Sequence, residues 1–484
     1  MTAPGWLATA DRDSPWPELR VVVAGIAVSG FAAADALVRL GAEVTVVDER
    51  DGEPERERAT VLEILGATTR LGPGAADQLP HGTQLLVTSP GWRPDAPLLA
   101  AATRARVLVW GEVELAWRLR DPHRPARWLA VTGTNGKTTT VRMLAEMLSA
   151  AGLHAAAAGN VGSPVIAAVL HPQPYDVIAV ELSSYQLHWT QSMTARSAAV
   201  LNVAPDHLDW HGSYTAYAAA KGRIYQGVEV ACVYNVADPQ TERLVRAADV
   251  TEGARAIGFT LGVPQVGMVG VVDGVLADRA FVAERQTSAA ELGSAADIVP
   301  PAPHNVANAL AAAALARSIG VPPVAVRDGL RAFRPDPHRI EVVGTVDGVV
   351  YVDDSKATNT HAALASLQAY DDVVWVAGGL AKGARFDELA AAAGPRLRGA
   401  VLIGADRQLL ADALARHAPD VPVVEVDSTD NQVMDRVVAA AARLARRGAT
   451  VLLAPACASM DMFANYAARG DAFAAAVRRR AGRP

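Results

Sequence analysis

The chain has 484 residues, of which 51% are hydrophobic and 20% are charged, and its net charge is −6. This hydrophobic content excludes an intrinsically disordered protein, and the negative charge argues against a general nucleic-acid binder, which is normally basic. The only cysteines, Cys232 and Cys457, are far apart, which excludes a disulfide scaffold and a cysteine-rich zinc site. At roughly 150 residues per domain, the length predicts about three domains.

The sequence also predicts where the protein resides. No stretch approaches the roughly 18–20 consecutive apolar residues of a membrane-spanning helix. Residues 1–20 have neither the apolar core of a signal peptide nor the arginine-rich pattern of a transit peptide. We therefore expect a soluble, cytoplasmic protein without a membrane span.

The first third of the chain has the pattern of a β-α-β unit. Residues 18–25 are an apolar strand, residues 29–41 an amphipathic helix, and residues 42–50 a second strand. Further apolar runs at 83–91 and 105–112 extend a parallel sheet. The middle of the chain adds a strand, loop and helix, three strands, a hairpin and a long helix, at 127–152, 175–184, 197–207, 228–235, 266–281 and 304–320.

A third α/β set begins near Arg339. Its strands, each alternating with a helical stretch, lie within 340–359, 372–380, 399–406, 421–428 and 448–461. The pattern predicts three α/β domains with parallel or mixed sheets: a Rossmann-like N-terminal domain (1–113), a central domain with a mainly parallel sheet (114–335) and a Rossmann-like C-terminal domain (336–484).

Lysine is rare in this chain. Only four of the 45 basic side chains are lysines, namely Lys137, Lys221, Lys356 and Lys382. Chance could scatter four lysines anywhere. However, lysine offers a compact ammonium with a tunable pKa and a potentially nucleophilic amine, which arginine does not. We therefore expect these four positions to be functional.

The strongest motif is the run from Thr132 to Thr139, which follows an apolar strand and opens a helix. This context exposes backbone N–H groups and a helix dipole to an anion, so the run predicts a phosphate loop, with Lys137 on the phosphates and Thr138 placed for Mg²⁺. The match is imperfect because Val131 stands where the usual pattern has glycine. The alternative is a glycine-rich turn without a ligand.

The N-terminal turn from Gly25 to Gly30 is a weaker motif. It lies between a strand and a helix, and Asp48 ends the next strand, which is typical of a dinucleotide site. Ala27 replaces the second glycine and would crowd a pyrophosphate, so we expect another nucleotide diphosphate rather than a nicotinamide cofactor. A Rossmann-like turn without a ligand is the alternative.

Two polar positions follow strands of the central domain. Glu181 ends a strand beside the phosphate loop, where a Mg²⁺ ligand is usual, although it could instead cap the next helix. His207 follows another strand of the same sheet, which favours a metal or phosphate role over a surface histidine. Lys221 lies on a later helix, and Asn305 and Asn308 begin another, where they could cap the helix or read a base edge.

In the third domain, small polar loops follow three strands at 353–359, 378–383 and 454–459. Active sites of open α/β sheets lie at the carboxyl ends of the strands, so the three loops predict one site. Two other classes of protein remain open. A P-loop kinase or GTPase would not need rare lysines in a third domain, and a nicotinamide-dependent oxidoreductase would leave the phosphate loop unexplained.

Together these loops resemble the Mur ligase family, the ATP-dependent amide-forming enzymes of peptidoglycan precursor synthesis, over essentially the whole chain. The phosphate loop 133–139 and the glutamate–serine run 181–184 are family-wide. Segments 353–359, 378–383 and 455–473 are most similar to the branch that adds D-glutamate, and the DNPR motif of the diaminopimelate- or lysine-adding branch is absent. A sibling Mur ligase or a folylpolyglutamate synthetase remains the alternative within this group.

The resemblance implies a function and its ligands. The chain would join D-glutamate to UDP-N-acetylmuramoyl-L-alanine through an acyl phosphate, with ATP and Mg²⁺, as a monomer that binds no nucleic acid. The first domain would hold the UDP-linked substrate, the central domain ATP, and the third domain the amino acid. The general base for the incoming amine is not identified.

The resemblance also implies the site residues. The ATP site would comprise Gly133, Thr134, Asn135, Gly136, Lys137, Thr138, Thr139, Asn308, Arg339 and Asp354. The magnesium ligands would be Thr138, Glu181, His207 and a carbamylated Lys221, and the catalytic set Lys137, Glu181, His207 and Lys221. The UDP-linked substrate would contact Val28, Ser29, Asp48, Arg50, Ser89, Pro90, Gly91, Asn160 and Gln186. D-glutamate would contact Lys356, Thr358, Lys382, Ser459, Met460 and Tyr466. Ala27 and Tyr466 depart from the family pattern, which has glycine and phenylalanine there.

Overall fold

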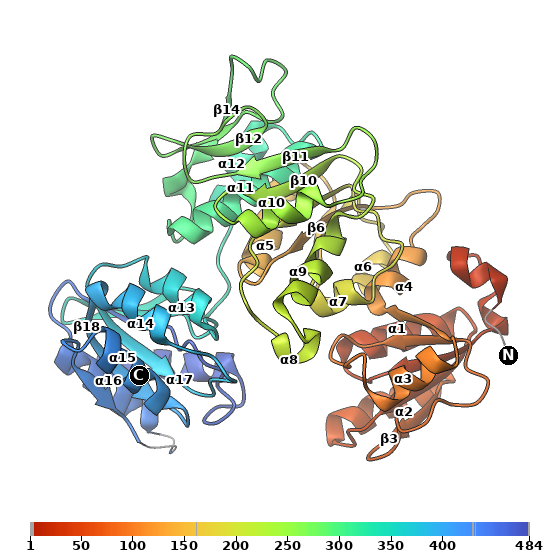
Figure 1. Ribbon diagram of the computed structural model, residues 1–484, viewed down its shortest axis with the longest axis horizontal. Coiled ribbons are helices and arrows are strands. Elements are labelled where there is room, and N and C mark those ends of the chain that lie inside the picture. The colour runs from red at the N-terminus through yellow and green to blue at the C-terminus, as the bar shows by residue number, and fades with distance from the viewer. Residues whose placement is uncertain (1–3, 161, 428–429, 431, 483–484) are drawn as a thin grey trace. The chain divides into compact units, whose positions relative to one another are not determined.

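The computed structural model describes residues 4–160, 162–427, 430 and 432–482. Over these residues the chain forms three sheets, each with its own helices (Figure 1). Residues 1–298 with 306–333 form one compact unit, which contains the first two sheets, and residues 299–305 with 334–484 form a second unit with the third sheet. The α/β class with mainly parallel sheets is therefore confirmed.

The first sheet is parallel throughout, in the order β3-β2-β1-β4-β5. Alternate residues of β1 enter different cores: Val21 and Val23 pack on one face, and Val22 and Ala24 on the other. Burial of both faces explains why the strand is a continuous apolar run. The strands are β1 (Arg20–Ala24), β2 (Glu43–Asp48), β3 (Thr68–Leu71), β4 (Leu85–Thr88) and β5 (Leu108–Gly111), and the helices are α1 (Val28–Arg39), α2 (Glu53–Leu65), α3 (Pro97–Arg104) and α4 (Glu112–Arg118).

The second sheet has the order β14-β13-β12-β11-β10-β9-β6-β8-β7. Its strands are parallel from β7 to β12, and β12, β13 and β14 pair antiparallel, which confirms the hairpin predicted at 266–281. The strands are β6 (Arg127–Thr132), β7 (Ala155–Gly159), β8 (Val177–Glu181), β9 (Ser197–Val200), β10 (Ala231–Asn235), β11 (Arg255–Phe259), β12 (Met268–Val272), β13 (Val275–Asp278) and β14 (Ala290–Ser294).

Helices cover both faces of this second sheet. Apolar residues of α5, α11 and α12 pack on one face, and those of α7 and α9 belong to the core on the other. The helices are α5 (Lys137–Ala150), α6 (Val165–Val169), α7 (Ser184–His188), α8 (Leu208–His211), α9 (Tyr214–Gly222), α10 (Pro239–Arg246), α11 (Pro303–Ser318) and α12 (Pro323–Ala332).

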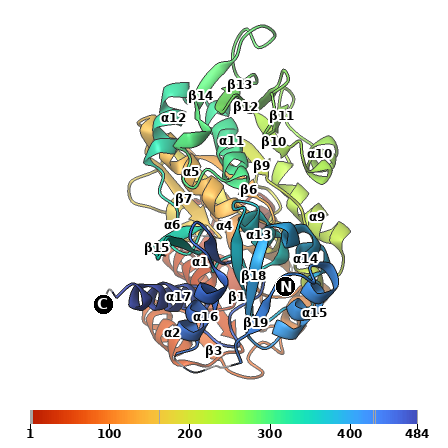
Figure 2. The ribbon, with the colours of Figure 1, turned by 90° about the vertical axis from the view of Figure 1, so that its left-hand side faces the viewer.

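The third sheet has the order β15-β16-β20-β17-β18-β19 and is parallel except for the pair of β15 and β16. Helices α13, α14 and α15 pack on one face, and α16 and α17 lie together on the other (Figure 2). The strands are β15 (Glu341–Val346), β16 (Val349–Asp353), β17 (Val373–Gly378), β18 (Leu397–Ile403), β19 (Val423–Glu425) and β20 (Thr450–Leu453). The helices are α13 (Thr360–Leu367), α14 (Asp387–Ala393), α15 (Arg407–His417), α16 (Val433–Leu444) and α17 (Tyr466–Arg480).

Two predicted limits differ from those of the structure. The strand expected at 421–428 is β19, and its residue 428 lies outside the described residues. The domain boundary expected at 113 falls inside α4, and the two compact units divide at 333 and 334, near the boundary expected at 335. The three-domain division itself stays a prediction.

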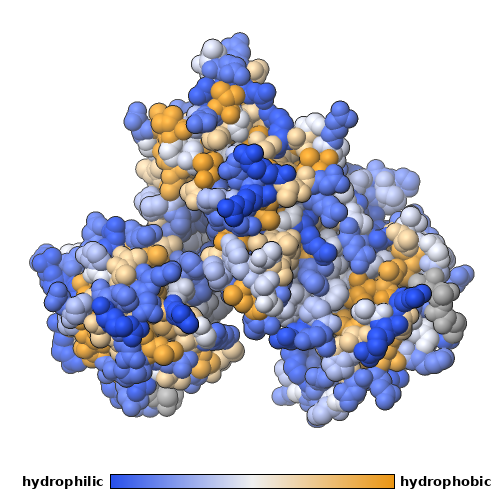
Figure 3. Space-filling view, in the orientation of Figure 1, coloured by the Kyte–Doolittle hydropathy of each residue, from blue (hydrophilic) through white to orange (hydrophobic). Residues whose placement is uncertain are grey.

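The face drawn in Figure 3 is mostly hydrophilic, and its apolar areas are separated from one another. Among the residues described, no helix combines the length and the apolar character needed to cross a bilayer.

Candidate functional site

The phosphate loop lies between β6 and α5. Gly136, at φ +84°, is the N-cap of α5, and a Cβ there would overlap the side-chain amide of Asn308. Lys137 folds back over the loop, and its Nζ donates to the carbonyl oxygens of Gly133 (2.9 Å) and Thr134 (3.0 Å). The first N–H groups of a helix have no partner within it, so this end of α5 suits an anion.

Neighbouring side chains hold this loop in place. Asn135 N donates to Asn202 Oδ1 (2.9 Å), and Asn202 Nδ2 donates back to Asn135 O (3.1 Å). The Thr134 hydroxyl lies 2.9 Å from Tyr217 Oη and accepts from Ala204 N (3.0 Å). The loop is therefore preorganised by residues that the sequence analysis did not single out, because their roles depend on contacts across the sheet.

Glu181 lies at the carboxyl end of β8, beside β6. It is 1% exposed, and its Oε1 accepts from Asn160 Nδ2 (2.9 Å). Its Oε2 is buried without a hydrogen-bond partner in the described part of the chain. A buried carboxylate oxygen without a partner is costly, so this atom suits a cation.

Lys221 reaches the same place from α9. Its side chain is 2% exposed, and Nζ donates to Gly133 O (2.8 Å) and more weakly to Thr132 Oγ1 (3.5 Å). Burial lowers the pKa of Lys221 well below its usual value, and Lys137 lowers it further, against the opposing charges of Asp206 and Glu181. The amine is thus biased toward its neutral, nucleophilic form.

Together these side chains suit a divalent cation that prefers oxygen ligands. Thr138 supplies a buried hydroxyl at the start of α5, and Glu181 supplies the oxygen without a partner. Lys221 fits only if its charge is removed, since an ammonium would repel the ion. Magnesium takes oxygen ligands from carboxylates and phosphates, and here a buried carboxylate lies beside the predicted phosphate loop.

His207 lies in the same electrostatic environment. It is the N-cap of α8 at φ +52°, and its ring stacks obliquely on Tyr185, with 4.8 Å between centroids. Burial lowers the pKa of His207, Asp206 opposes this shift, and Lys137 and Lys221 add to it. A neutral imidazole is therefore favoured, which is the form that binds metals and accepts protons.

Gln186 and Asn160 are already engaged. Gln186 Oε1 accepts from Ser183 N (2.9 Å) in a capping box at the start of α7. The Asn160 amide is bonded to Glu181. Their roles toward substrate stay predictions, and Asn160 also orients the candidate metal ligand.

In the N-terminal sheet, the predicted residues follow β1, β2 and β4. Ile26 N donates to Asp48 Oδ2 (2.9 Å), and Arg50 pairs with the same carboxylate (2.9 Å). Burial opposes the ionisation of Asp48, but the hydrogen bonds from Arg50 and Ile26 outweigh it and lower the pKa. Asp48 therefore orients Arg50, whose side chain is 58% exposed.

The start of α1 faces the same edge of this sheet. Within the described structure its N-cap, Ala27, has no capping side chain, and Val28 is 58% exposed. The buried Ser89 hydroxyl has no hydrogen-bond partner among described residues, and a Cβ on Gly25 would meet it. Free N–H groups and a free hydroxyl at one strand edge suit a phosphate group. Of the other residues predicted here, Ser29 lies in the first turn of α1, and Pro90 and Gly91 lie in the turn after β4.

In the C-terminal unit, the three predicted loops follow β16, β20 and β17, which are neighbours in the sheet. Main-chain hydrogen bonds join Leu380 and Ala458 in both directions (2.9 and 3.0 Å), so the loops that carry Lys382 and Ser459 are tied together. Lys356 Nζ lies 5.2 Å from the centroid of the Tyr466 ring. Ser459 is 4% exposed, whereas Met460 is 63% exposed. Thr358 N donates to Lys356 O (2.9 Å).

Asp354 lies at the base of the first of these loops. Its carboxylate accepts a hydrogen bond from the Ser366 hydroxyl. Burial raises the pKa of Asp354 to about 6, against the hydrogen bond from Ser366 and the charge of Arg339. Arg339 and Asp354 are therefore near each other, as expected if both contact one ligand.

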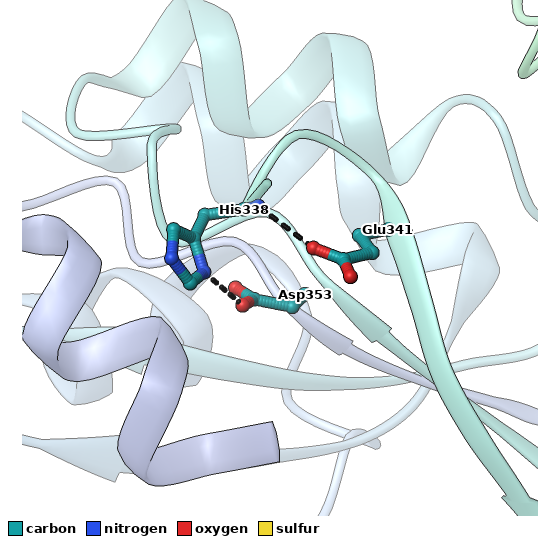
Figure 4. Close-up of side chains that lie close together, drawn as sticks. All are labelled: His338, Glu341 and Asp353. Carbon is teal, nitrogen blue, oxygen red and sulfur yellow. Dashed lines mark hydrogen bonds and ion pairs between the residues drawn. The ribbon is translucent and has the colours of Figure 1, made fainter. Parts of the chain in front are cut away.

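Sequence reasoning missed His338, which adjoins Arg339. Its Nδ1 shares a 2.7 Å hydrogen bond with the buried Asp353, and its main-chain N donates to Glu341 (3.0 Å) (Figure 4). The three side chains are close enough to be considered for a metal, but the Nδ1 position is engaged by Asp353. The arrangement instead fixes the imidazole orientation at the start of β15. A histidine directly before a predicted site arginine was the available signal.

A glycine controls the approach of the two tied loops. Gly379 has φ +133°, and a Cβ there would overlap the carbonyl oxygen of Ala458. We expect Gly379→Ala to lower the free energy of unfolding by roughly 3 kcal/mol, measured by urea denaturation. The control is Gly383→Ala, where φ is +80° but a Cβ meets nothing within 4 Å, and the loss should be about 1 kcal/mol. Equal losses would show that close approach of the loops is not the constraint.

Comparison with known proteins identifies the family. The family model for the Mur ligase middle domain matches residues 131–316, and the family model for the Mur ligase glutamate ligase domain matches residues 338–457. The chain belongs to the Mur ligase family. As a Mur ligase it is an ATP-dependent ligase of peptidoglycan precursor synthesis, and the family predicted from its loops is confirmed.

Among its relatives is a protein of Streptomyces avermitilis named UDP-N-acetylmuramoylalanine–D-glutamate ligase, 67% identical over 96% of this Mur ligase and 98% of the relative. Proteins with the same name from Thermobifida fusca and Mycolicibacterium smegmatis are 59% and 48% identical, over 96% and 97% of this chain and 99% and 98% of their own.

Solved structures share the fold. The UDP-N-acetylmuramate–alanine ligase of Thermotoga maritima aligns with a TM-score of 0.56 at 19% identity, over 95% of this chain and 99% of its own. The MurF ligase of the same organism, in complex with ADP, aligns with a TM-score of 0.53 at 17% identity, over 98% of this chain and 99% of its own. At these identities the likeness supports the architecture alone.

Proposed function

We propose that this Mur ligase joins D-glutamate to UDP-N-acetylmuramoyl-L-alanine, with conversion of ATP to ADP and phosphate. The observation that carries the proposal is the sheet edge after β16, β20 and β17, where two rare lysines and a buried serine lie on loops that are tied or adjacent. An amino acid with a second carboxylate needs cationic and hydroxyl partners, which this edge offers. The name of these relatives supplies D-glutamate as that amino acid.

The reaction must activate a carboxylate, which is a poor electrophile. The alanyl carboxylate attacks the γ-phosphorus of ATP, the bond to the β-phosphate oxygen breaks, and ADP leaves. Lys137 and the N–H groups at the start of α5 would neutralise the charge on the transferring phosphoryl group. The product is an acyl phosphate, whose carbonyl carbon can accept an amine.

In the second step the amine of D-glutamate attacks that carbonyl carbon and phosphate leaves, which forms the amide. Lys382, Ser459 and Lys356 would bind the two carboxylates and orient the amine. The amine must lose a proton before or during the attack.

Magnesium belongs to this proposal as the cation that neutralises phosphate charge when it is bound. Glu181, Thr138 and His207 would hold it, together with Lys221 as a carbamate. Lys221 suits that modification because its amine is buried and its pKa is lowered, so that it can add carbon dioxide to give an anionic oxygen ligand. The remaining residues predicted to contact ATP, the UDP-linked substrate or D-glutamate are proposed to contact those same ligands.

Two further parts of the proposal are the state and the location of the protein. We expect a monomer, so light scattering coupled to size exclusion should give the mass of one chain.

We also expect a cytoplasmic location, because ATP and UDP-linked precursors are cytoplasmic metabolites. Fractionation of cells that express a tagged chain should recover it with cytoplasmic markers.

The amino-acid pocket has its own test. We expect Lys382→Ala and Ser459→Ala to raise the KM for D-glutamate by about tenfold or more, because each removes a hydrogen bond to a charged group. The KM for ATP should change by less than about twofold, a difference of under 0.5 kcal/mol. Steady-state phosphate release measures both constants.

The matched control is Arg385→Ala, which removes an exposed positive charge three residues from Lys382. It should leave the KM for D-glutamate nearly unchanged. If Arg385→Ala matches Lys382→Ala, the loop attracts anions by charge alone and Lys382 is no specific ligand.

A further inference from the structure

A buried arginine lies beneath the amino-acid pocket. Arg469, on α17, is 1% exposed, and its hydrogen bonds go to main-chain carbonyls and a serine hydroxyl rather than to a carboxylate, while Asp461 and Asp353 act on it only at longer range. Burial lowers the pKa of Arg469 to about 10, so the side chain keeps its charge at neutral pH. Burying a guanidinium without a carboxylate is costly unless its donors are well satisfied.

The donors of Arg469 are satisfied by the loops themselves. Nε donates to Ser355 Oγ (3.0 Å), and Nη2 donates to Ser355 O (2.9 Å) and Cys457 O (3.2 Å). Nη1 donates to Cys457 O (3.2 Å) and, at a longer 3.4 Å, to Gly378 O. All of these partners belong to the ends of β16, β20 and β17.

Each partner lies within four residues of one proposed to bind the amino acid. Ser355 precedes Lys356, Cys457 lies two residues before Ser459, and Gly378 begins the loop that carries Lys382. The Ser355 hydroxyl in turn donates to Tyr466 O (2.7 Å), at the start of α17. One guanidinium therefore connects all three loops and the first turn of α17.

Only a planar group with several donors can make these contacts. A guanidinium directs N–H groups outward in a fixed fork, whereas a lysine ammonium donates from a single nitrogen. Lysine at this position would keep the charge and lose the span between Ser355 and Cys457. The chemistry thus distinguishes a need for geometry from a need for positive charge.

We propose that Arg469 is a positioning residue, which fixes the relative placement of Lys356, Lys382 and Ser459 and so sets the affinity for the amino-acid substrate. The inference rests on the proposed function, because it assigns the three loops to the D-glutamate pocket. Arg469 itself is covered by these loops and does not contact the substrate.

The test is Arg469→Lys in the full-length chain. We expect the KM for D-glutamate to rise by about tenfold or more, since the loss of one or two charge-assisted hydrogen bonds is of that size. The KM values for ATP and for the UDP-linked substrate, and kcat at saturating D-glutamate, should change by less than about threefold. Guanidinium ion added at low millimolar concentration to Arg469→Ala should partly restore the KM for D-glutamate.

The matched control is Arg317→Lys in the central domain. Arg317 is also buried and bonded, by Nε to Asp278 (2.9 Å) and by Nη1 to Val321 O (2.6 Å), but it lies outside the C-terminal unit. Arg317→Lys should lower the melting temperature and leave the KM for D-glutamate unchanged. A purely structural role for Arg469 would make the two variants behave alike, and that result would overturn the inference.

A second variant covers the case in which Arg469→Lys does not fold. Ser355→Ala removes the hydroxyl between Arg469 and Tyr466 but keeps the guanidinium and its carbonyl partners, so the KM for D-glutamate should rise by about threefold, the effect of one ordinary hydrogen bond. Where both variants fold, their effects on this constant should be less than additive, because both disrupt one network. An unchanged KM in Ser355→Ala would contradict the inference.

Failure of the proposed function would look different. If the wild-type chain releases phosphate with another amino acid, the D-glutamate assignment is wrong, and the same variants are then compared by the KM for that amino acid. A selective rise in that constant would still support positioning by Arg469, and no selective rise would overturn it.

Discussion

Lys137→Ala is expected to abolish ATP turnover while the UDP-linked substrate still binds. Lys137 Nζ closes over the phosphate loop through Gly133 O and Thr134 O, which places its charge where the transferring phosphoryl group is proposed to lie. Losing one such electrostatic group typically lowers kcat by roughly 10²–10³-fold, and we expect a loss of at least this size. Phosphate release measures turnover, and isothermal titration calorimetry measures binding of UDP-N-acetylmuramoyl-L-alanine.

ATP and the UDP-linked substrate are expected to bind independently because their proposed binding residues follow strands of different sheets. Lys137 follows β6 of the second sheet, whereas the residues proposed for the UDP-linked substrate follow β1, β2 and β4 of the first. The control is Lys137→Arg, which keeps the charge but replaces the compact ammonium with a wider planar group, and which should also be strongly impaired. Equal loss of turnover and of UDP-substrate binding, in a variant with a normal melting temperature, would contradict the assignment of the ligands to different sheets.

Lys221→Ala should be nearly inactive and partly rescued by formate. The proposed carbamate supplies an anionic oxygen near Glu181, and a small carboxylate can occupy the space left by the side chain. Lys221→Arg should be inactive because arginine cannot form a carbamate. It should also not be rescued, because the arginine side chain fills the buried site that formate would have to enter. Activity is measured over a series of formate concentrations at constant ionic strength.

The control for this rescue is Lys137→Ala at the same formate concentrations, where no activity should return. In mass spectrometry under bicarbonate, the intact wild-type chain should carry the added mass of carbon dioxide, which we assign to Lys221. Rescue of Lys221→Ala by alkylamines rather than by carboxylates would show that positive charge is needed there, and the carbamate would be wrong.

Local sequence was enough to predict the fold and the loops. Glycine turns after apolar strands indicated where β1, β6 and β17 end, and parallel pairing brings such ends to one edge of a sheet. The rarity of lysine was a second signal, since Lys137 and Lys221 both donate to Gly133 O in the phosphate loop. The spacing between these two lysines carries no sign of that contact.

Interactions between distant segments could not be predicted. Arg469 donates to Ser355, more than a hundred residues away, and nothing in the local pattern of α17 distinguishes it from an exposed arginine. Gln186 shows the same dependence, because the contact by which its amide oxygen caps α7 is visible only in the folded chain, while its role toward the substrate stays a prediction. Burial and partner atoms decide such roles, and both depend on the folded chain.

The central claim is tested most directly with an amino-acid panel. The wild-type chain, ATP, Mg²⁺ and UDP-N-acetylmuramoyl-L-alanine are incubated with D-glutamate, L-glutamate, D-aspartate, L-alanine, L-lysine or meso-diaminopimelate, and phosphate release is scored together with the mass of the product. The account predicts phosphate release and an amide product with D-glutamate, and little with the others. Efficient ligation of a different amino acid, or phosphate release with D-glutamate that does not require the UDP-linked acceptor, would contradict it.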